Sequence, residues 1–133
     1  MAKLKDCALD SFQYSVSELL LRNKSILDEM TKLEISNARI NRTLSKAVTH
    51  CGCISINARK QNYPEDMESD KITGLSTHLE GKLCPTCRDF IEREIGHHLF
   101  YLASLCNSLD LNLYDIILKE MERLELLGKF NLR

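Results

Sequence analysis

Two close pairs of cysteines are the residues of this 133-residue chain whose type and spacing point most directly to chemistry. Cys51 and Cys53 form a C-x-C pair, and Cys84 and Cys87 form a C-x-x-C pair that begins after thirty further residues. Four thiolates in a tetrahedral arrangement bind zinc, and sulfur ligands select zinc over magnesium or calcium. The spacing therefore predicts a structural zinc site that joins two distant segments of the chain.

Other interpretations of the cysteines remain open. His50 or His78 could replace one thiolate, the cysteines could carry no metal, or the C-x-x-C pair could be redox-active at a helix N-terminus. A redox C-x-x-C normally follows a strand in a βαβ unit, and the sequence shows no such unit, so we favour the metal site. The remaining cysteines, Cys7 and Cys106, lie on predicted helix faces and are expected to be small core residues.

The composition is typical of a globular, mainly helical protein. Hydrophobic residues make up 44% of the chain and charged residues 28%, with two prolines and five glycines. The formal net charge of -1 provides no general attraction to nucleic acid or anionic lipid. The N-terminus lacks the apolar core of a signal peptide, and no apolar run approaches the roughly 20 residues that cross a bilayer. We therefore expect a cytoplasmic protein with no membrane partner, in which thiols stay reduced.

The first part of the chain is predicted to form two helices. From Leu4 to Cys51 there is neither proline nor glycine, and apolar or small residues recur at helical spacing. Because one helix of that length would be unusual in a small domain, we expect a break near Asn23, with helices over about 5–22 and 25–50. The apolar stripe consists of Leu9, Phe12, Val16, Leu19, Ile26, Met30, Leu33, Ile40, Leu44, Ala47 and Cys51.

The second part is predicted to contain a long connection and two more helices. The polar segment of about 57–82 should be a partly mobile loop, with one short helix around Ser69–Leu79. A third helix should begin at Pro85, because proline suits the first helical position. A fourth should span Leu113–Leu127, with Asn112 as its N-terminal cap.

The whole chain, 1–133, is therefore expected to be a single all-α domain, a four-helix bundle with a zinc-clamped connection between the second and third helices. Cys51 and Cys53 fall where the second helix ends, and Cys84 and Cys87 flank the start of the third. These ends would be neighbours if the two helices run antiparallel. The apolar seams of the first two helices favour a homodimer, since a dimer is the commonest closed assembly.

The third predicted helix and its turn into the fourth resemble the MazG-type all-α nucleotide pyrophosphohydrolases. The resemblance rests on EIGHHLFYLASLCNSL at Glu94–Leu109 and DLNLYD at Asp110–Asp115, where the family has a helix of the form E-x-x-D-x-L-x-Y-L and then a short turn. It covers residues 90–125 well, and the four-helix layout of the remainder loosely. The resemblance implies an all-α, commonly dimeric fold whose helical carboxylates hold magnesium over a nucleoside triphosphate.

Most of the acidic residues of that family are missing here. Glu34 is the only acid in the segment 34–44, where the family has E-E-x-x-E, and His97 stands three residues after Glu94 in place of aspartate. Imidazole is a poor ligand for magnesium, which prefers oxygen. The Glu94-x-x-His97 spacing also occurs in di-iron bundles, but those sites need a second such pair, and the sequence contains none. The resemblance therefore favours a member whose magnesium site is degraded.

Cations occupy the face of the second helix where the resemblance implies carboxylates. Arg39, Arg42 and Lys46 share that face, and their charge would repel a metal ion. They could instead hold a phosphate group of a nucleotide or of a nucleic acid, with His97 as a further candidate ligand-binding residue. A solvated helix surface is the simpler interpretation.

Together these patterns predict a zinc-stabilised, MazG-like helical protein that acts as a binding or regulatory module without hydrolysis. One alternative is a magnesium-dependent nucleoside triphosphate pyrophosphohydrolase, in which Glu94 and Glu34 would be catalytic and Glu18, Asp28 or Glu29 would supply further acids. A second alternative is a nucleic-acid-associated zinc protein, which the near-neutral charge argues against.

Overall fold

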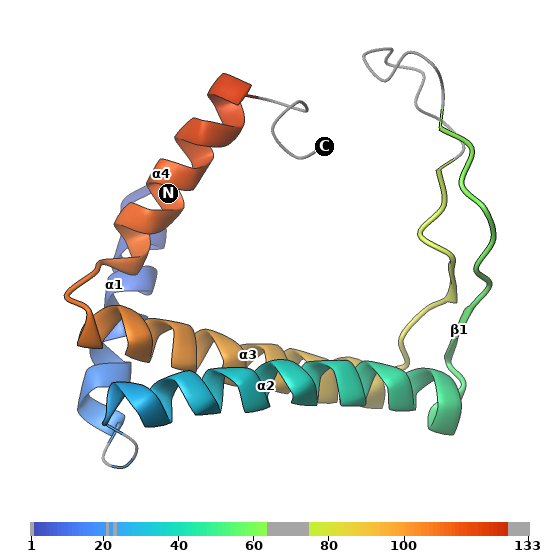
Figure 1. The fold of residues 1–133 in the computed structure, drawn as a ribbon, viewed down its shortest axis with the longest axis horizontal. Helices are drawn as coiled ribbons and strands as arrows, with labels where there is room; N and C mark the ends of the chain where they lie inside the picture. Colours follow the sequence, from blue (N-terminus) through green and yellow to red (C-terminus); the bar gives the residue numbers. More distant parts are fainter. Residues whose placement is uncertain (1, 21, 23, 64–74, 128–133) are drawn as a thin grey trace. The chain divides into compact units, whose positions relative to one another are not determined.

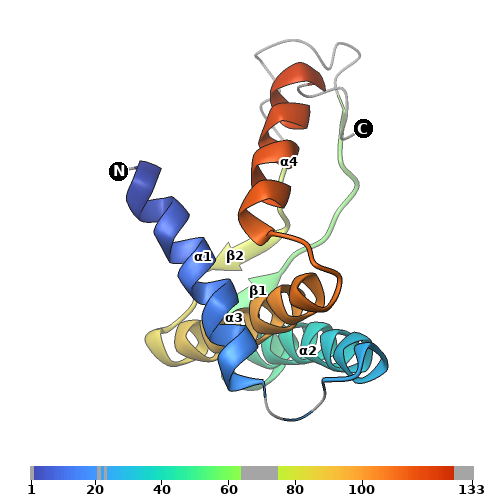
Figure 2. The same ribbon diagram turned by 90° about the vertical axis from the view of Figure 1, so that its left-hand side faces the viewer.

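Within the residues that the structure describes, the protein is mainly helical, with four α-helices and one small β-hairpin (Figures 1 and 2). The computed structural model describes residues 2–20, 22, 24–63 and 75–127, and for residues 2–6 the backbone alone. The elements in chain order are α1 (Ala2–Leu19), α2 (Ile26–Lys46), a π-helical turn η1 (Ala47–Cys51), β1 (Ile54–Ile56), β2 (Leu79–Gly81), α3 (Pro85–Ser108) and α4 (Leu113–Leu127).

The chain forms two compact units, which are described separately. The helical unit comprises residues 1–38 and 94–133, and the cysteine unit comprises residues 39–93. Both units contain part of α2 and part of α3. That the chain is one domain stays a prediction.

In the helical unit, a single glutamine joins α1 to the turn between α3 and α4. Gln13 is buried, and its Nε2 donates hydrogen bonds to Asn107 Oδ1 at 2.9 Å and to the Leu111 carbonyl at 2.7 Å. Its Oε1 accepts a bond from the Leu113 backbone N–H at 2.8 Å. The Leu113 N–H is the first of α4 and has no hydrogen-bond partner within the helix. Gln13 therefore satisfies one of the unpaired N–H donors at the start of α4.

The start of α4 follows the sequence prediction. Asn112 Oδ1 accepts a hydrogen bond from the Asp115 backbone N–H at 2.9 Å, as an N-terminal cap does. Asn112 Nδ2 also donates to Asp10 Oδ1 on α1 at 3.2 Å. The predicted cap and the predicted span Leu113–Leu127 are both confirmed.

In the cysteine unit, the hairpin packs against η1 and the first turns of α3. The strands pair antiparallel, with Ile54 opposite Gly81 and Ile56 opposite Leu79. Ile54 is 2% exposed and forms a small hydrophobic cluster with Ala47 and Ile91. Two cysteines, Cys53 and Cys87, pack against this cluster. The core of the unit thus adjoins the cysteines directly.

The four-helix prediction is confirmed, while several details differ. The break between the first two helices is present, although Asn23 itself lies outside the described residues. The first helix ends at Leu19, and the second is α-helical only to Lys46, because η1 replaces its last turn. The third helix begins at Pro85 as predicted.

The connection between α2 and α3 is irregular over residues 57–63, as predicted, but the short helix expected within it is absent from the described residues. Of the short helix expected around 69–79, residues 69–74 lie outside the described part of the chain, residues 75–78 are not helical, and Leu79 begins β2. The apolar-polar alternation at Ile54–Ile56 is a strand, so the expectation of a purely α-helical chain missed the hairpin.

Burial departs from the apolar pattern of the sequence. Val16 and Ala47 are buried as the stripe predicts, but Leu19 is 70% and Met30 52% exposed. Cys106 is buried, whereas Cys7 is exposed, so the expectation of a core position was wrong for Cys7. Within the described residues, no helix has the length and apolar character that crossing a membrane requires.

Candidate metal centre

The hairpin brings the two cysteine pairs together. Cys53 directly precedes β1, and Cys84 follows β2 after two residues. Pairing of the strands therefore places the end of η1, which continues α2, beside the start of α3. Two glycines make this geometry possible. Gly52 adopts a left-handed φ of 78° and its N–H donates to the Ala47 carbonyl at 2.9 Å, which ends η1. Gly81 has a φ of 84°, and a Cβ there would lie 2.6 Å from the Cys53 carbonyl oxygen.

The four sulfur atoms form one compact group. All four Sγ atoms of Cys51, Cys53, Cys84 and Cys87 lie within 4.8 Å of one another, and the Cys51 and Cys84 sulfurs are 3.8 Å apart. Four sulfurs bound to zinc at about 2.3 Å in a tetrahedron are themselves about 3.8 Å apart. The distance across the two pairs therefore fits a zinc ion in the centre of the group. All six cysteines of the chain are free thiols.

Cys84 is the N-terminal cap of α3. Its carbonyl accepts a bond from the Arg88 N–H at 2.9 Å, and its sulfur accepts a bond from the Cys87 N–H at 3.4 Å. That N–H and the Cys87 thiol favour the thiolate and lower the pKa of Cys84 to about 7. A helix N-terminus thus prepares one ligand in its anionic form.

The other thiols of the group do not ionise as easily. The neighbouring Cys84 sulfur raises the pKa of Cys87 to about 12, because it accepts a hydrogen bond from the Cys87 thiol. For Cys51, the Cys53 N–H and the Cys87 side chain favour the thiolate, but the side chains of Cys84 and Cys53 together with desolvation outweigh them and raise the pKa. Without a cation, four thiolates would repel one another, so the group retains protons that a metal would displace.

Neither histidine that sequence reasoning considered belongs to this group. The ligand set of the described residues consists of the four cysteines, and neither His50 nor His78 is part of it. The group is also the only set of three or more histidine, cysteine or acidic side chains in the described part of the chain with the spacing of a metal site.

The candidate catalytic acids, Glu34 and Glu94, belong to no group of described side chains with the spacing of a metal site. Glu34 is exposed on α2. The Glu94 side chain is 21% exposed, and its Oε2 lies 3.9 Å from His97 Nδ1. Arg39, Arg42 and Lys46 are exposed on α2, and none of them forms an ion pair with another described residue.

Sequence reasoning missed the environment of Glu29. It was only one of several acids that could have joined Glu94, yet it is 2% exposed and accepts hydrogen bonds from Ser104 and Ser108 on α3. The spacing of these serines, four residues apart in the mainly apolar second half of α3, was the available signal.

Comparison with protein-family models, curated proteins and solved structures gave no match for this chain. The resemblance to the MazG-type pyrophosphohydrolases therefore stays a prediction.

Proposed function

We propose that this protein is a zinc-stabilised helical binding module, divergent from the MazG-type pyrophosphohydrolases, in which Cys51, Cys53, Cys84 and Cys87 hold a structural zinc ion. The observation that carries the zinc proposal is the 3.8 Å separation of the Cys51 and Cys84 sulfurs within a four-sulfur group. A site with four protein thiolates has no open position for a substrate, which is typical of structural zinc.

The small core of the cysteine unit explains why a metal would matter there. Among its described residues, the hydrophobic cluster has only three buried members, Ala47, Ile54 and Ile91. Fully burying an isoleucine contributes about 1.5–3 kcal/mol, whereas binding of structural zinc contributes on the order of 10 kcal/mol to small domains. Zinc would therefore be the main source of stability for this unit.

Metal analysis of protein purified without added metal tests the zinc proposal. We expect about one zinc per chain from a single four-thiolate site, and loss of that zinc in Cys51→Ser and Cys84→Ser. Cys7→Ser is the matched control, because Cys7 is exposed and lies outside the group. Protein without zinc or iron, whose thermal stability is unchanged when all four cysteines become serine, would refute the proposal.

Two placements support a binding role without hydrolysis. Glu94 faces His97 instead of a further carboxylate, and Glu34 projects into solvent. The test is incubation with nucleoside triphosphates and magnesium or manganese. We expect no steady release of pyrophosphate; release that Glu94→Gln abolishes would instead establish the enzyme alternative.

The ligand that we propose for this role carries phosphate and binds the basic face of α2. Arg39, Arg42 and Lys46 follow at three- and four-residue spacing, are exposed, and have no described ion-pair partner. Arg39→Ala combined with Arg42→Ala should weaken nucleotide binding, measured by fluorescence anisotropy, while Arg59→Ala should not. Equal binding by all three proteins would exclude this face.

We further propose that the protein is a homodimer. None of the fifteen residues of α4 is buried, and most of its large apolar side chains are exposed, among them Ile116, Met121 and Leu126 at 40%, 52% and 84%. A second copy would cover such a face. Sedimentation should show a dimer at micromolar concentration, and a Met121→Glu variant should shift it to monomer. A wild-type monomer would contradict the proposal.

A further inference from the structure

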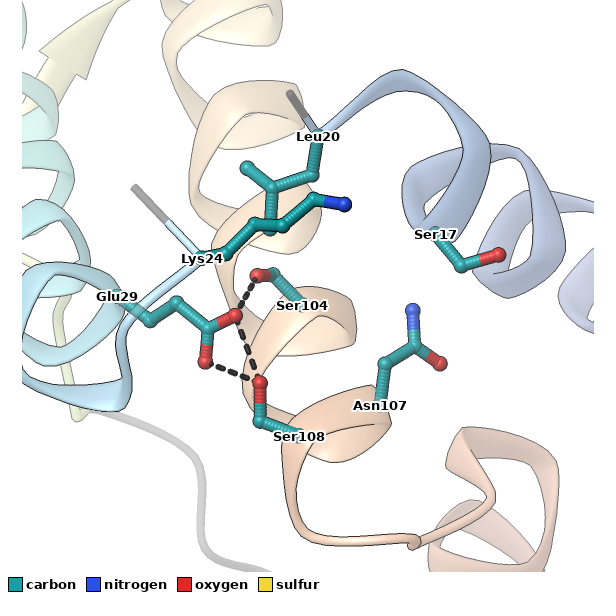
Figure 3. Close-up of a pocket in the computed structure, with 7 residues that line it drawn as sticks. All are labelled: Ser17, Leu20, Lys24, Glu29, Ser104, Asn107 and Ser108. Atoms are coloured by element: carbon teal, nitrogen blue, oxygen red, sulfur yellow. Dashed lines mark hydrogen bonds between the residues drawn. The ribbon is translucent and has the colours of Figure 1, made fainter. Parts of the chain in front are cut away.

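A pocket in the helical unit, separate from the cysteines, contains a buried carboxylate. It has a volume of about 190 Å³ and lies between the end of α1, the start of α2 and the end of α3 (Figure 3). Its lining residues include Leu20, Lys24, Glu29, Ser104 and Ser108. Every one of them belongs to the helical unit.

Glu29 is the least exposed charged residue of the described chain, at 2%. Its Oε1 accepts hydrogen bonds from Ser104 Oγ at 2.8 Å and Ser108 Oγ at 2.7 Å, and its Oε2 lies 2.6 Å from Ser108 Oγ. No described lysine, arginine or histidine forms an ion pair with it. Buried charges are normally paired with an opposite charge, and this carboxylate has no cationic partner among the described residues.

The two serines beside Glu29 have engaged donors and unused acceptors. Each serine has one hydroxyl proton, and both serines direct it to Glu29. Asn107 is held by Gln13 at both ends, because its Oδ1 accepts from Gln13 Nε2 at 2.9 Å and its Nδ2 donates to the Gln13 carbonyl at 3.1 Å. A carboxylate has about four lone-pair sites, so two hydroxyl protons do not saturate it. A ligand at this end must therefore bring donors and positive charge.

The pocket carries the opposite charge on another part of its lining. Lys24 is exposed, and its amine points away from the Glu29 carboxylate in Figure 3. A ligand with positive charge alone would meet repulsion from this ammonium, and one with negative charge alone would meet repulsion from Glu29. Only a molecule with both charges complements both residues.

We propose that this pocket binds a small zwitterion. The ammonium group of the ligand donates to Glu29 and to the free lone pairs of Ser104 and Ser108, and its anionic group, a carboxylate or a phosphate, pairs with Lys24. Leu20 supplies apolar contact for a short hydrocarbon stem between them. The volume suits a molecule of amino-acid size and is too small for an intact nucleotide.

Calorimetric titration of the full chain tests this proposal with four probes. 3-Aminopropanoate carries an ammonium and a carboxylate, phosphoethanolamine carries an ammonium and a phosphate, and methylamine and acetate each carry one charge. We expect binding of at least one zwitterion and much weaker binding of both single-charge probes. Tighter binding of phosphoethanolamine would identify the anion as phosphate, and tighter binding of 3-aminopropanoate would identify it as carboxylate. Binding of neither zwitterion, or equal binding of methylamine, would overturn the proposal.

Variants then assign the charges. Glu29→Gln and Lys24→Met should each weaken zwitterion binding about tenfold or more, since each removes a charge-assisted hydrogen bond. Glu122→Gln and Lys119→Met, two exposed changes on α4, are the matched controls and should leave binding unchanged. Wild-type affinity in both pocket variants would refute the assignment.

A measurement on the wild-type protein locates the ligand without relying on the folding of the Glu29→Gln variant. Addition of the zwitterion should shift the amide NMR signals of residues 104–108 and of Glu29 selectively. Shifts confined to other parts of the chain would place the ligand elsewhere and overturn the proposal.

Discussion

Loading the metal-free protein with zinc should release protons in a number that the sulfur group determines. At pH 7, Cys84 with a pKa of about 7 is half ionised, whereas Cys87 with a pKa of about 12 is protonated. Cys51, whose pKa is raised above the ordinary 9.0, is also protonated. Since zinc binds thiolates, these three cysteines release about two and a half protons at pH 7.

The number should change with pH in a defined direction. Below its pKa, Cys84 holds a full proton, so the three cysteines release about three protons at pH 6 and about two at pH 8. The apparent zinc affinity therefore rises with pH, and its logarithm climbs by at least about two per pH unit throughout this window. Low pH should favour the metal-free, less stable protein.

Calorimetry in several non-coordinating buffers of different ionisation enthalpy measures the released protons at pH 6, 7 and 8. Cys7→Ser should behave as wild type, because its sulfur is outside the group. Release of fewer than two protons at pH 7, or an affinity independent of pH, would refute the ionisation states on which this reasoning rests.

Three pairs of substitutions test the packing of the two units. Gly81→Ala should lower the melting temperature of the zinc-loaded protein more than Gly52→Ala. A Cβ at Gly81 would lie 2.6 Å from the Cys53 carbonyl oxygen, whereas a Cβ at Gly52 would have no atom within 4 Å. Equal changes in melting temperature would contradict this. Gln13→Ala should reduce the free energy of unfolding in urea by about 2 kcal/mol, since it removes three part-buried hydrogen bonds, whereas exposed Ser15→Ala should change little. Asn112→Ala should lower the free energy of unfolding by about 1 kcal/mol in the same assay, and Asn112→Asp should lower it much less. Equal values for both variants and the wild type would show that the cap does not stabilise the protein.

Local signals predicted the helices well. Pro85 marked the start of α3 and Asn112 the cap of α4, because the fixed φ of proline and the short amide of asparagine act on their own helical turn. The hairpin was missed for the opposite reason. Three residues at Ile54–Ile56 form a strand only when Leu79–Gly81 supplies the hydrogen-bond partners, and neither segment reveals the other.

The apolar pattern predicted helix periodicity but not burial. Leu19 and Met30 fit the helical stripe and yet are exposed, while Gln13 and Glu29 are buried. Burial depends on which element packs against a face, and residues on α1 and α2 meet partners on α3 and α4 far along the chain. No local property of a glutamate indicates that two serines more than seventy residues away will donate hydrogen bonds to it.

The sequence alone determined that four cysteines in two close pairs stand at the ends of helices, since ligand type and helix boundaries are local properties. Only the tertiary structure decided that their sulfurs converge within 4.8 Å, because convergence requires the non-local register of β1 with β2. It alone also placed Glu29 in a pocket with Lys24. Contacts between distant residues follow from the packing of whole elements, which single-residue patterns do not specify.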